Sequence, residues 1–251
     1  MSVKPFTIAK SLTEKQWVKA IKQDPNNLIE SNSKLKKSNI YQWTVPALTA
    51  SVVKNGKLVT MKTCPMAEAC AEACYACQGG YLFKSSMVSH TRKLQAYIDD
   101  PTNLAFDIVN DLQRIRKIKA LRIHDSGDFF NRTYAMWWIN IMKALPNIKF
   151  YAYTKQVAMF KKLTEKGLIP DNFTIIYSFG GKQDHMINEK VDRHSKVFSS
   201  HAAMKAAGYS DTTEKDDNAA NPKIKNVGLV YHGKVKVTTA LGGKTVMGQA
   251  A

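Results

Sequence analysis

Cysteine is absent from most of this 251-residue chain, because all four cysteines lie between Cys64 and Cys77. Disulfide-held secreted proteins distribute their cysteines in pairs across the sequence. The clustering therefore excludes a disulfide scaffold. It favours a metal or cluster site in a reducing compartment, and we expect the protein in the cytoplasm.

The sequence also lacks any stretch of about 20 apolar residues, the length that a membrane-spanning helix needs. Its first residues, Met1 to Pro5, do not form the apolar core of a signal peptide. We therefore expect no membrane association. With 44% hydrophobic residues, the chain can form one barrel-sized domain over residues 1–251.

Acidic residues are scarce, with 20 Asp and Glu against 37 Lys and Arg, so the formal net charge is +17. Such a charge attracts polyanions, and nucleic acid is a candidate partner. The alternative is a lysine-rich surface that only keeps the protein soluble, since no helix-turn-helix, zinc-finger or aromatic RNA-binding signature accompanies the charge.

The first 40 residues are expected to form an extension with one helix, from Thr13 to Gln23. Strands at Tyr41–Leu48 and Ser51–Met61 follow. The sequence Asn55-Gly56 inside the second apolar run predicts a β-hairpin with a type I′ turn.

Periodic apolar residues then predict two helices and three strand–helix units, the arrangement of parallel α/β proteins. The helices are Leu82–Asp99 and Asn103–Ile118, and the units are Ala120–His124 with Thr133–Leu145, Ile148–Thr154 with Val157–Lys166, and Phe173–Ser178 with Asp192–Ala207. We expect a partial or complete TIM-like (βα) barrel.

The C-terminal part is less regular. Residues 210–222 are polar and are expected to form a mobile loop. Val227–Tyr231 and Val235–Thr239 predict a closing hairpin, and residues 242–251 a loose tail.

The cysteines Cys64, Cys70, Cys74 and Cys77 are separated by five, three and two residues. Such closely spaced thiolates in one loop are typical of iron–sulfur ligands, and we predict a [4Fe–4S] cluster. Zinc is the first alternative, although structural zinc sites more often use two pairs with a longer separation. A redox disulfide or a set of buried structural thiols would also fit four neighbouring cysteines.

The spacing of Cys70, Cys74 and Cys77 resembles that of radical S-adenosylmethionine (SAM) enzymes, and βα units follow it as in that superfamily. This resemblance implies a radical-SAM-like barrel, a three-cysteine [4Fe–4S] cluster and SAM as a further cofactor.

Cys64-Pro65, Cys70 and Cys74-Tyr75-Ala76 also resemble the motif of a bacteriophage family known as gene product 88. The resemblance continues to the segment His124–Phe129 and to Tyr153-Thr154-Lys155. It implies a phage origin and selects Cys64, Cys70 and Cys74. A closed site would use all four cysteines, which is the arrangement we favour.

Polar residues that follow predicted strands are expected at the rim of the barrel, beside the cysteines. Asp125 and Asp128 either bind a ligand and move protons or cap the next helix. His124 is a candidate base or a structural histidine, and Lys155 either binds an anion or is solvated. These four residues are the candidate catalytic side chains.

Three functions remain open from sequence. The fourth cysteine and the lack of an evident SAM-binding motif favour a phage-encoded redox or regulatory iron–sulfur protein that acts with an unidentified redox partner or host protein. The alternatives are a divergent radical SAM enzyme, with Asp125 and Asp128 near SAM, and a nucleic-acid-binding protein with a structural cluster.

Overall fold

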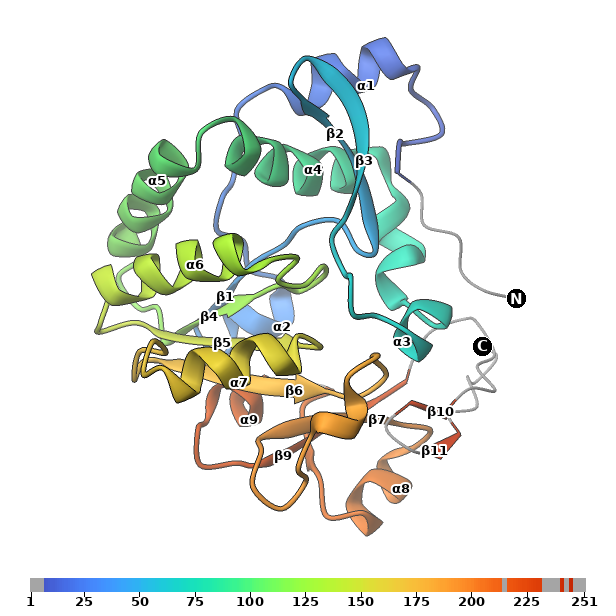
Figure 1. Cartoon of the computed structure of the whole chain (residues 1–251), viewed down its shortest axis with the longest axis vertical. Helices are drawn as coiled ribbons and strands as arrows, with labels where there is room; N and C mark the ends of the chain where they lie inside the picture. Colours follow the sequence, from blue (N-terminus) through green and yellow to red (C-terminus); the bar gives the residue numbers. More distant parts are fainter. Residues whose placement is uncertain (1–6, 214–215, 232–239, 242–243, 246–251) are drawn as a thin grey trace.

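A seven-stranded parallel sheet forms the centre of the computed structural model, which describes residues 7–213, 216–231, 240–241 and 244–245 (Figure 1). In spatial order its strands are β1 (Ile40–Trp43), β4 (Ala120–Ile123), β5 (Lys149–Thr154), β6 (Phe173–Ser178), β7 (His194–Phe198), β9 (Asn226–Val230) and β8 (Ser210–Asp211). Every neighbouring pair is parallel. The sheet curls into a half-barrel, so the α/β class and the partial barrel are confirmed, whereas the described strands do not close a complete barrel.

Four helices cover one side of this sheet, which we call the outer face. They are α4 (Lys84–Asp99), α5 (Pro101–Arg114), α6 (Arg132–Ala144) and α7 (Val157–Glu165). Large apolar side chains such as Trp43, Trp138 and Phe160 are fully buried there. Asp100 caps α5 by accepting hydrogen bonds from two backbone N–H groups, with Pro101 in the first turn, so the predicted helix break is confirmed.

The opposite side, the inner face, is covered at the strand amino ends by α2 (Ser33–Lys36) and α9 (Asp217–Ala220). Leu35 of α2 and Ala219 of α9 pack there on Ile40 and Ala120, the first residues of β1 and β4. Towards the carboxyl ends the inner face becomes polar, because Arg122 and Tyr153 alternate with outward-facing apolar residues.

The N-terminal helix and the hairpin form as predicted. Helix α1 (Glu14–Ile21) begins with a capping box between Thr13 and Gln16. Strands β2 (Thr49–Lys54) and β3 (Lys57–Lys62) are antiparallel and are joined by Asn55 and Gly56, whose φ angles of 50° and 73° fit a type I′ turn. The Trp17 indole donates to the Ser51 carbonyl at 2.9 Å, which ties α1 to β2.

The predicted helix at Asp192–Ala207 is wrong. Residues His194–Phe198 form β7, and only His201–Ala206 form a helix, α8, which is capped by Ser200. Strand β7 lies between β6 and β9 and satisfies its backbone groups there, so tertiary pairing overrides the local helical spacing.

The C-terminal part differs from expectation in other ways. Residues 210–222, predicted to be mobile, contain β8 and α9, and Thr212 and Asp216 are buried. Strand β9 is confirmed and pairs in parallel with β7 and β8, whereas the expected hairpin partner Val235–Thr239 lies outside the described residues. Of the expected tail, Lys244–Thr245 (β11) pairs with Ala240–Leu241 (β10).

The remaining short helices are α3 (Ala69–Glu72), η1 (Tyr75–Cys77), η2 (Gly79–Leu82) and η3 (Asp184–Met186). Three of them belong to the cysteine segment between β3 and α4. Within the described part of the chain, no helix is long and apolar enough to cross a lipid bilayer.

Candidate functional site

The cysteine loop, residues 63–82, lies on the loops that follow strands of the central sheet. The Cys70 backbone N–H donates to the Gly180 carbonyl at 2.9 Å, and Lys182 N–H donates to Met66 at 3.0 Å. Asp128 N–H, after β4, donates to the Thr63 carbonyl at 3.0 Å. The cysteines and two of the predicted rim loops are therefore brought together at the carboxyl ends of the strands.

Gly181 makes this close approach possible. A Cβ atom at that position would stand 2.8 Å from the Met66 carbonyl oxygen and 3.0 Å from the Lys155 side chain. Neither contact is tolerated without a shift of the loops. The glycine at position 181 is thus explained by the docking of the cysteine loop.

All four thiols are gathered in this loop. Cys74 and Cys77 are buried, Cys64 and Cys70 are half-buried, and none forms a disulfide. Cys64 Sγ accepts a hydrogen bond from Leu48 N–H at 3.3 Å. The Cys64 thiol interacts electrostatically with Cys70 and Cys74, and Cys77 with Cys64 and Cys70, so the four sulfur atoms face a common region.

Their protonation follows from burial and from each other. Burial raises the pKa of the Cys64 and Cys70 thiols. A hydrogen bond between Cys74 and Cys77 raises the pKa of Cys74 and lowers that of Cys77. Metal binding would therefore have to displace protons, which makes it dependent on pH.

Among the described residues, no three Cys, His, Asp or Glu side chains converge closely enough to bind a single metal ion. The ligands of a four-iron cluster bind separate iron atoms, so their sulfurs stand farther apart around a larger object. Four free thiols in one loop are the type of donor that such a cluster uses.

Lys155 lies beside the thiols. Its ammonium group is within hydrogen-bond reach of Cys70 and donates to Ser178 Oγ at 3.1 Å. Burial disfavours the charged form, but Cys70, Asp128 and Cys64 outweigh this and raise the pKa of Lys155.

Asp128 is 5% exposed and accepts three hydrogen bonds, from Thr154 Oγ1 at 2.6 Å, Phe129 N–H at 2.7 Å and Lys155 N–H at 2.9 Å. Burial nevertheless raises the pKa of its carboxyl group. Asp128 thus holds the β5 loop in place and adds negative charge close to Cys64.

Asp125 belongs to a different network, on the inner face. Its carboxylate accepts a hydrogen bond from Tyr81 and pairs with Arg122 at 3.2 Å, and its carbonyl accepts one from Tyr75. Arg122 also binds Asp216 at 3.0 Å. The cysteine loop is therefore joined to the start of α9 through Asp125 and Arg122.

His124 is directed into the core. It is 3% exposed, its Nε2 lies 3.1 Å from the Tyr134 hydroxyl, and burial lowers its pKa to about 3. The ring stacks edge-on against Phe129. These contacts place a neutral His124 ring in the core, away from the thiols.

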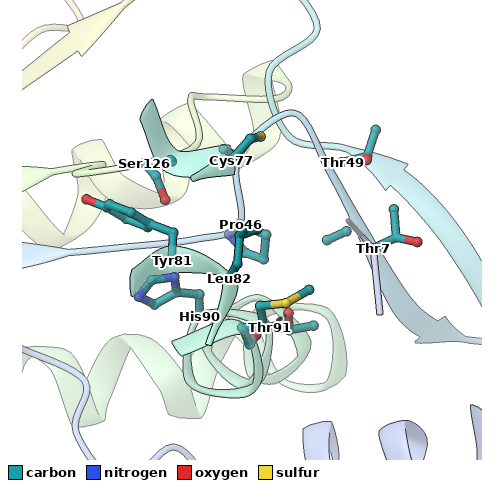
Figure 2. A pocket seen from close by; sticks show the side chains of 13 residues that line it. Thr7, Pro46, Thr49, Cys77, Tyr81, Leu82, His90, Thr91 and Ser126 are labelled. Carbon is teal, nitrogen blue, oxygen red and sulfur yellow. Dashed lines mark hydrogen bonds between the residues drawn. The ribbon is translucent and has the colours of Figure 1, made fainter. Parts of the chain in front are cut away.

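A cavity of about 30 Å³ lies beside the loop, on the side of α4 (Figure 2). Cys77, Tyr81, His90 and Ser126 line it together with Thr49. Burial lowers the pKa of His90 to about 4, so this ring is neutral near pH 7. The volume is enough for roughly two water molecules.

Sequence reasoning missed Arg122, Tyr81 and Asp216. Arg122 is the charged residue in the otherwise apolar strand Ala120–Ile123, and that exception was the signal that could have found it. Asp216 lies in a segment predicted to be mobile, where no signal marked it.

The family model of gene product 88 matches residues 19–243. This chain belongs to the gene product 88 family. The match confirms the resemblance carried by the Cys-Pro and Cys-Tyr-Ala motifs and extends it on both sides of the segments from Cys64 to Lys155.

Two curated relatives in this family come from bacteriophages. The Gene 88 protein of Mycobacterium phage L5 is 34% identical over 46% of this chain and 52% of that protein. The Gene 88 protein of Mycobacterium phage D29 is 33% identical over 48% of this chain and 58% of that protein. The alignments thus span little more than half of each relative. No solved structure matches the chain, and the radical SAM resemblance finds no support in these comparisons.

Proposed function

We propose that this protein binds a [4Fe–4S] cluster through Cys64, Cys70, Cys74 and Cys77, and that it has a redox or regulatory role in the cytoplasm of a phage-infected bacterium. The carrying observation is that four thiols of one short loop interact with one another at the carboxyl ends of a parallel sheet. The phage origin of the named relatives supports the cellular setting.

The residues present would act as follows. The four thiolates would hold the cluster, and the backbone contacts to Gly180 and Asp128 would fix the loop around it. Tyr75 and Tyr81 pack edge to face at 5.6 Å, and Tyr81 would help to shield the cluster from water. When bound, the cluster would supply one-electron chemistry, with an unidentified redox partner or host protein as the other party.

The test is anaerobic purification followed by iron and sulfide analysis and EPR spectroscopy of the reduced protein. We expect stoichiometric iron and sulfide and a reduced-cluster signal. Zinc in place of iron, or a metal-free protein after anaerobic reconstitution, would refute the proposal.

Single Cys→Ala variants test which of the four cysteines bind the cluster. Each of the four is expected to lose iron and sulfide, whereas Ala71→Ser, a change in the same loop that removes no thiol, keeps them. Retention of a wild-type cluster in Cys64→Ala would show that only three cysteines bind.

The same samples test the radical SAM alternative. With four thiolate ligands, added SAM should leave the EPR signal unchanged. A perturbed signal and formation of 5′-deoxyadenosine under reducing conditions would instead establish an open iron and a SAM-cleaving enzyme.

The formal charge of +17 favours a second candidate function, the binding of nucleic acid with the cluster as a structural element. Binding of DNA or RNA should then weaken steeply as salt concentration rises. Absence of any salt-dependent binding would remove this candidate.

A further inference from the structure

Contacts at the ends of three strands determine the position of Lys155. The residue follows β5, its backbone N–H donates to Asp128 after β4, and its ammonium group donates to Ser178 at the end of β6. The ammonium group is also within hydrogen-bond reach of Cys70 and interacts electrostatically with Cys64. The cation is therefore held against the thiols by the sheet itself and not by a flexible surface loop.

The Lys155 ammonium group interacts electrostatically with Asp128 as well as with the thiols, but no hydrogen bond joins it to that carboxylate among the described residues. The carboxylate of Asp128 is close, but its hydrogen bonds come from Thr154 and two backbone N–H groups. The ammonium group donates to the Ser178 hydroxyl and is within hydrogen-bond reach of the Cys70 thiol. A half-buried cation in such surroundings is complementary to thiolates or to another anion at the same place.

Charge and hydrogen bonds to the sulfur atoms are among the factors that set the reduction potential of an iron–sulfur cluster. Reduction adds one electron, and hence one negative charge, without adding a proton. A fixed ammonium group next to a ligand sulfur stabilises the reduced form more than the oxidised form.

We propose that Lys155 is a positioning residue that holds Cys70 and raises the reduction potential of the cluster. This inference rests on the proposed cluster-binding function. The electron comes from a one-electron donor outside the protein, which is dithionite in the experiment below.

The test compares reduction potentials, measured by EPR-monitored redox titration of anaerobically purified protein. Lys155→Met keeps the length of the side chain and removes its charge, whereas Lys155→Arg keeps the charge. At the wild-type midpoint potential, we expect Lys155→Met to lower the ratio of reduced to oxidised cluster about tenfold, a shift of about 59 mV for one electron. Lys155→Arg should stay close to wild type.

Lys182→Met is the matched control. Lys182 also reaches the cysteine loop, because its ammonium group donates to the Pro65 carbonyl at 3.2 Å, but it is exposed to solvent. Solvent screens its charge, so its removal should leave the potential almost unchanged.

An unchanged potential in Lys155→Met, or an equal shift in Lys182→Met, would overturn the role of Lys155. Loss of the cluster in Lys155→Met with retention in Lys155→Arg would support it, and loss in both would contradict it. A wild-type protein without iron would refute cluster binding itself, so the two failures are distinguishable.

Discussion

The outer face of the sheet buries Trp43, Trp138 and Phe160 against long helices, and each of these side chains is inaccessible to solvent. On the inner face, Arg122 forms ion pairs with Asp125 and Asp216. Hydrophobic burial stabilises the outer face and does not depend on charge pairing. The inner face is stable only while each charged side chain keeps its partner. The comparison indicates that apolar burial stabilises the outer face, whereas paired charges stabilise the inner face.

The largest expected effect tests the outer face. Phe160→Ala should lower the free energy of unfolding by about 3–5 kcal/mol, because it removes apolar contacts and leaves a cavity. Phe106→Ala is the control, since Phe106 is 66% exposed and its loss should cost about 0.5 kcal/mol or less. Denaturant unfolding measures both. Equal losses would contradict the assignment of the stable core to this face.

The inner face is tested by Asp216→Asn. Asp216 binds Arg122 and accepts a hydrogen bond from Tyr151 at 2.9 Å, so the variant leaves a buried cation with one partner fewer. We expect a loss of about 3 kcal/mol in unfolding free energy.

A double-mutant cycle with Arg122→Met sharpens that result. In the absence of the guanidinium group, Asp216→Asn should cost clearly less than in the wild-type background. Additive losses would mean that the two residues do not stabilise each other.

A pH effect of intermediate size is expected from His124, at the boundary of the two faces. Burial lowers its pKa from 6.5 to about 3, so the unfolded chain binds the proton more tightly than the folded one. Stability is therefore full above about pH 6.5 and falls as the pH drops towards 3, with about 2 kcal/mol lost between pH 7 and pH 5.

His124→Gln removes this titration. Unfolding measured across pH should then show a shallower slope, with the remainder due partly to His90, whose pKa burial lowers to about 4. An unchanged slope would show that His124 is already protonated or solvated.

The smallest effect concerns the rim. Gly181→Ala places a methyl group 2.8 Å from the Met66 carbonyl and should cost about 1–2 kcal/mol, with reduced iron content because the cysteine loop is displaced. Gly80→Ala, whose added carbon would meet only Phe83 at 4.0 Å, is the control. Equal stability and iron content in the two variants would contradict the close docking of the loop.

Much of the fold was predictable from local patterns. Thr13, Asn55-Gly56 and Asp100-Pro101 carry capping and turn chemistry that acts within a few residues, and the elements they bound form as expected. Residues 194–198 could not be assigned in this way, because their strand exists through pairing with β6 and β9.

The candidate site was predictable only as a set of residues. The cysteine spacing identifies the thiols, and the polar ends of strands identify Asp125, Asp128 and Lys155. The sequence could not predict that these residues separate into two groups. Strand order and register place Asp128 and Lys155 beside the thiols, and Asp125 beside Arg122.

The sequence alone determined the α/β class, the hairpin before the cysteines and the family motif, since each depends on residue type and short-range spacing. Only the tertiary structure decided that the sheet stays open as a half-barrel, that His124 lies in the core and that Lys155 faces Cys70. These outcomes depend on which distant segments pack together, and contacts between distant segments leave no local pattern in the chain.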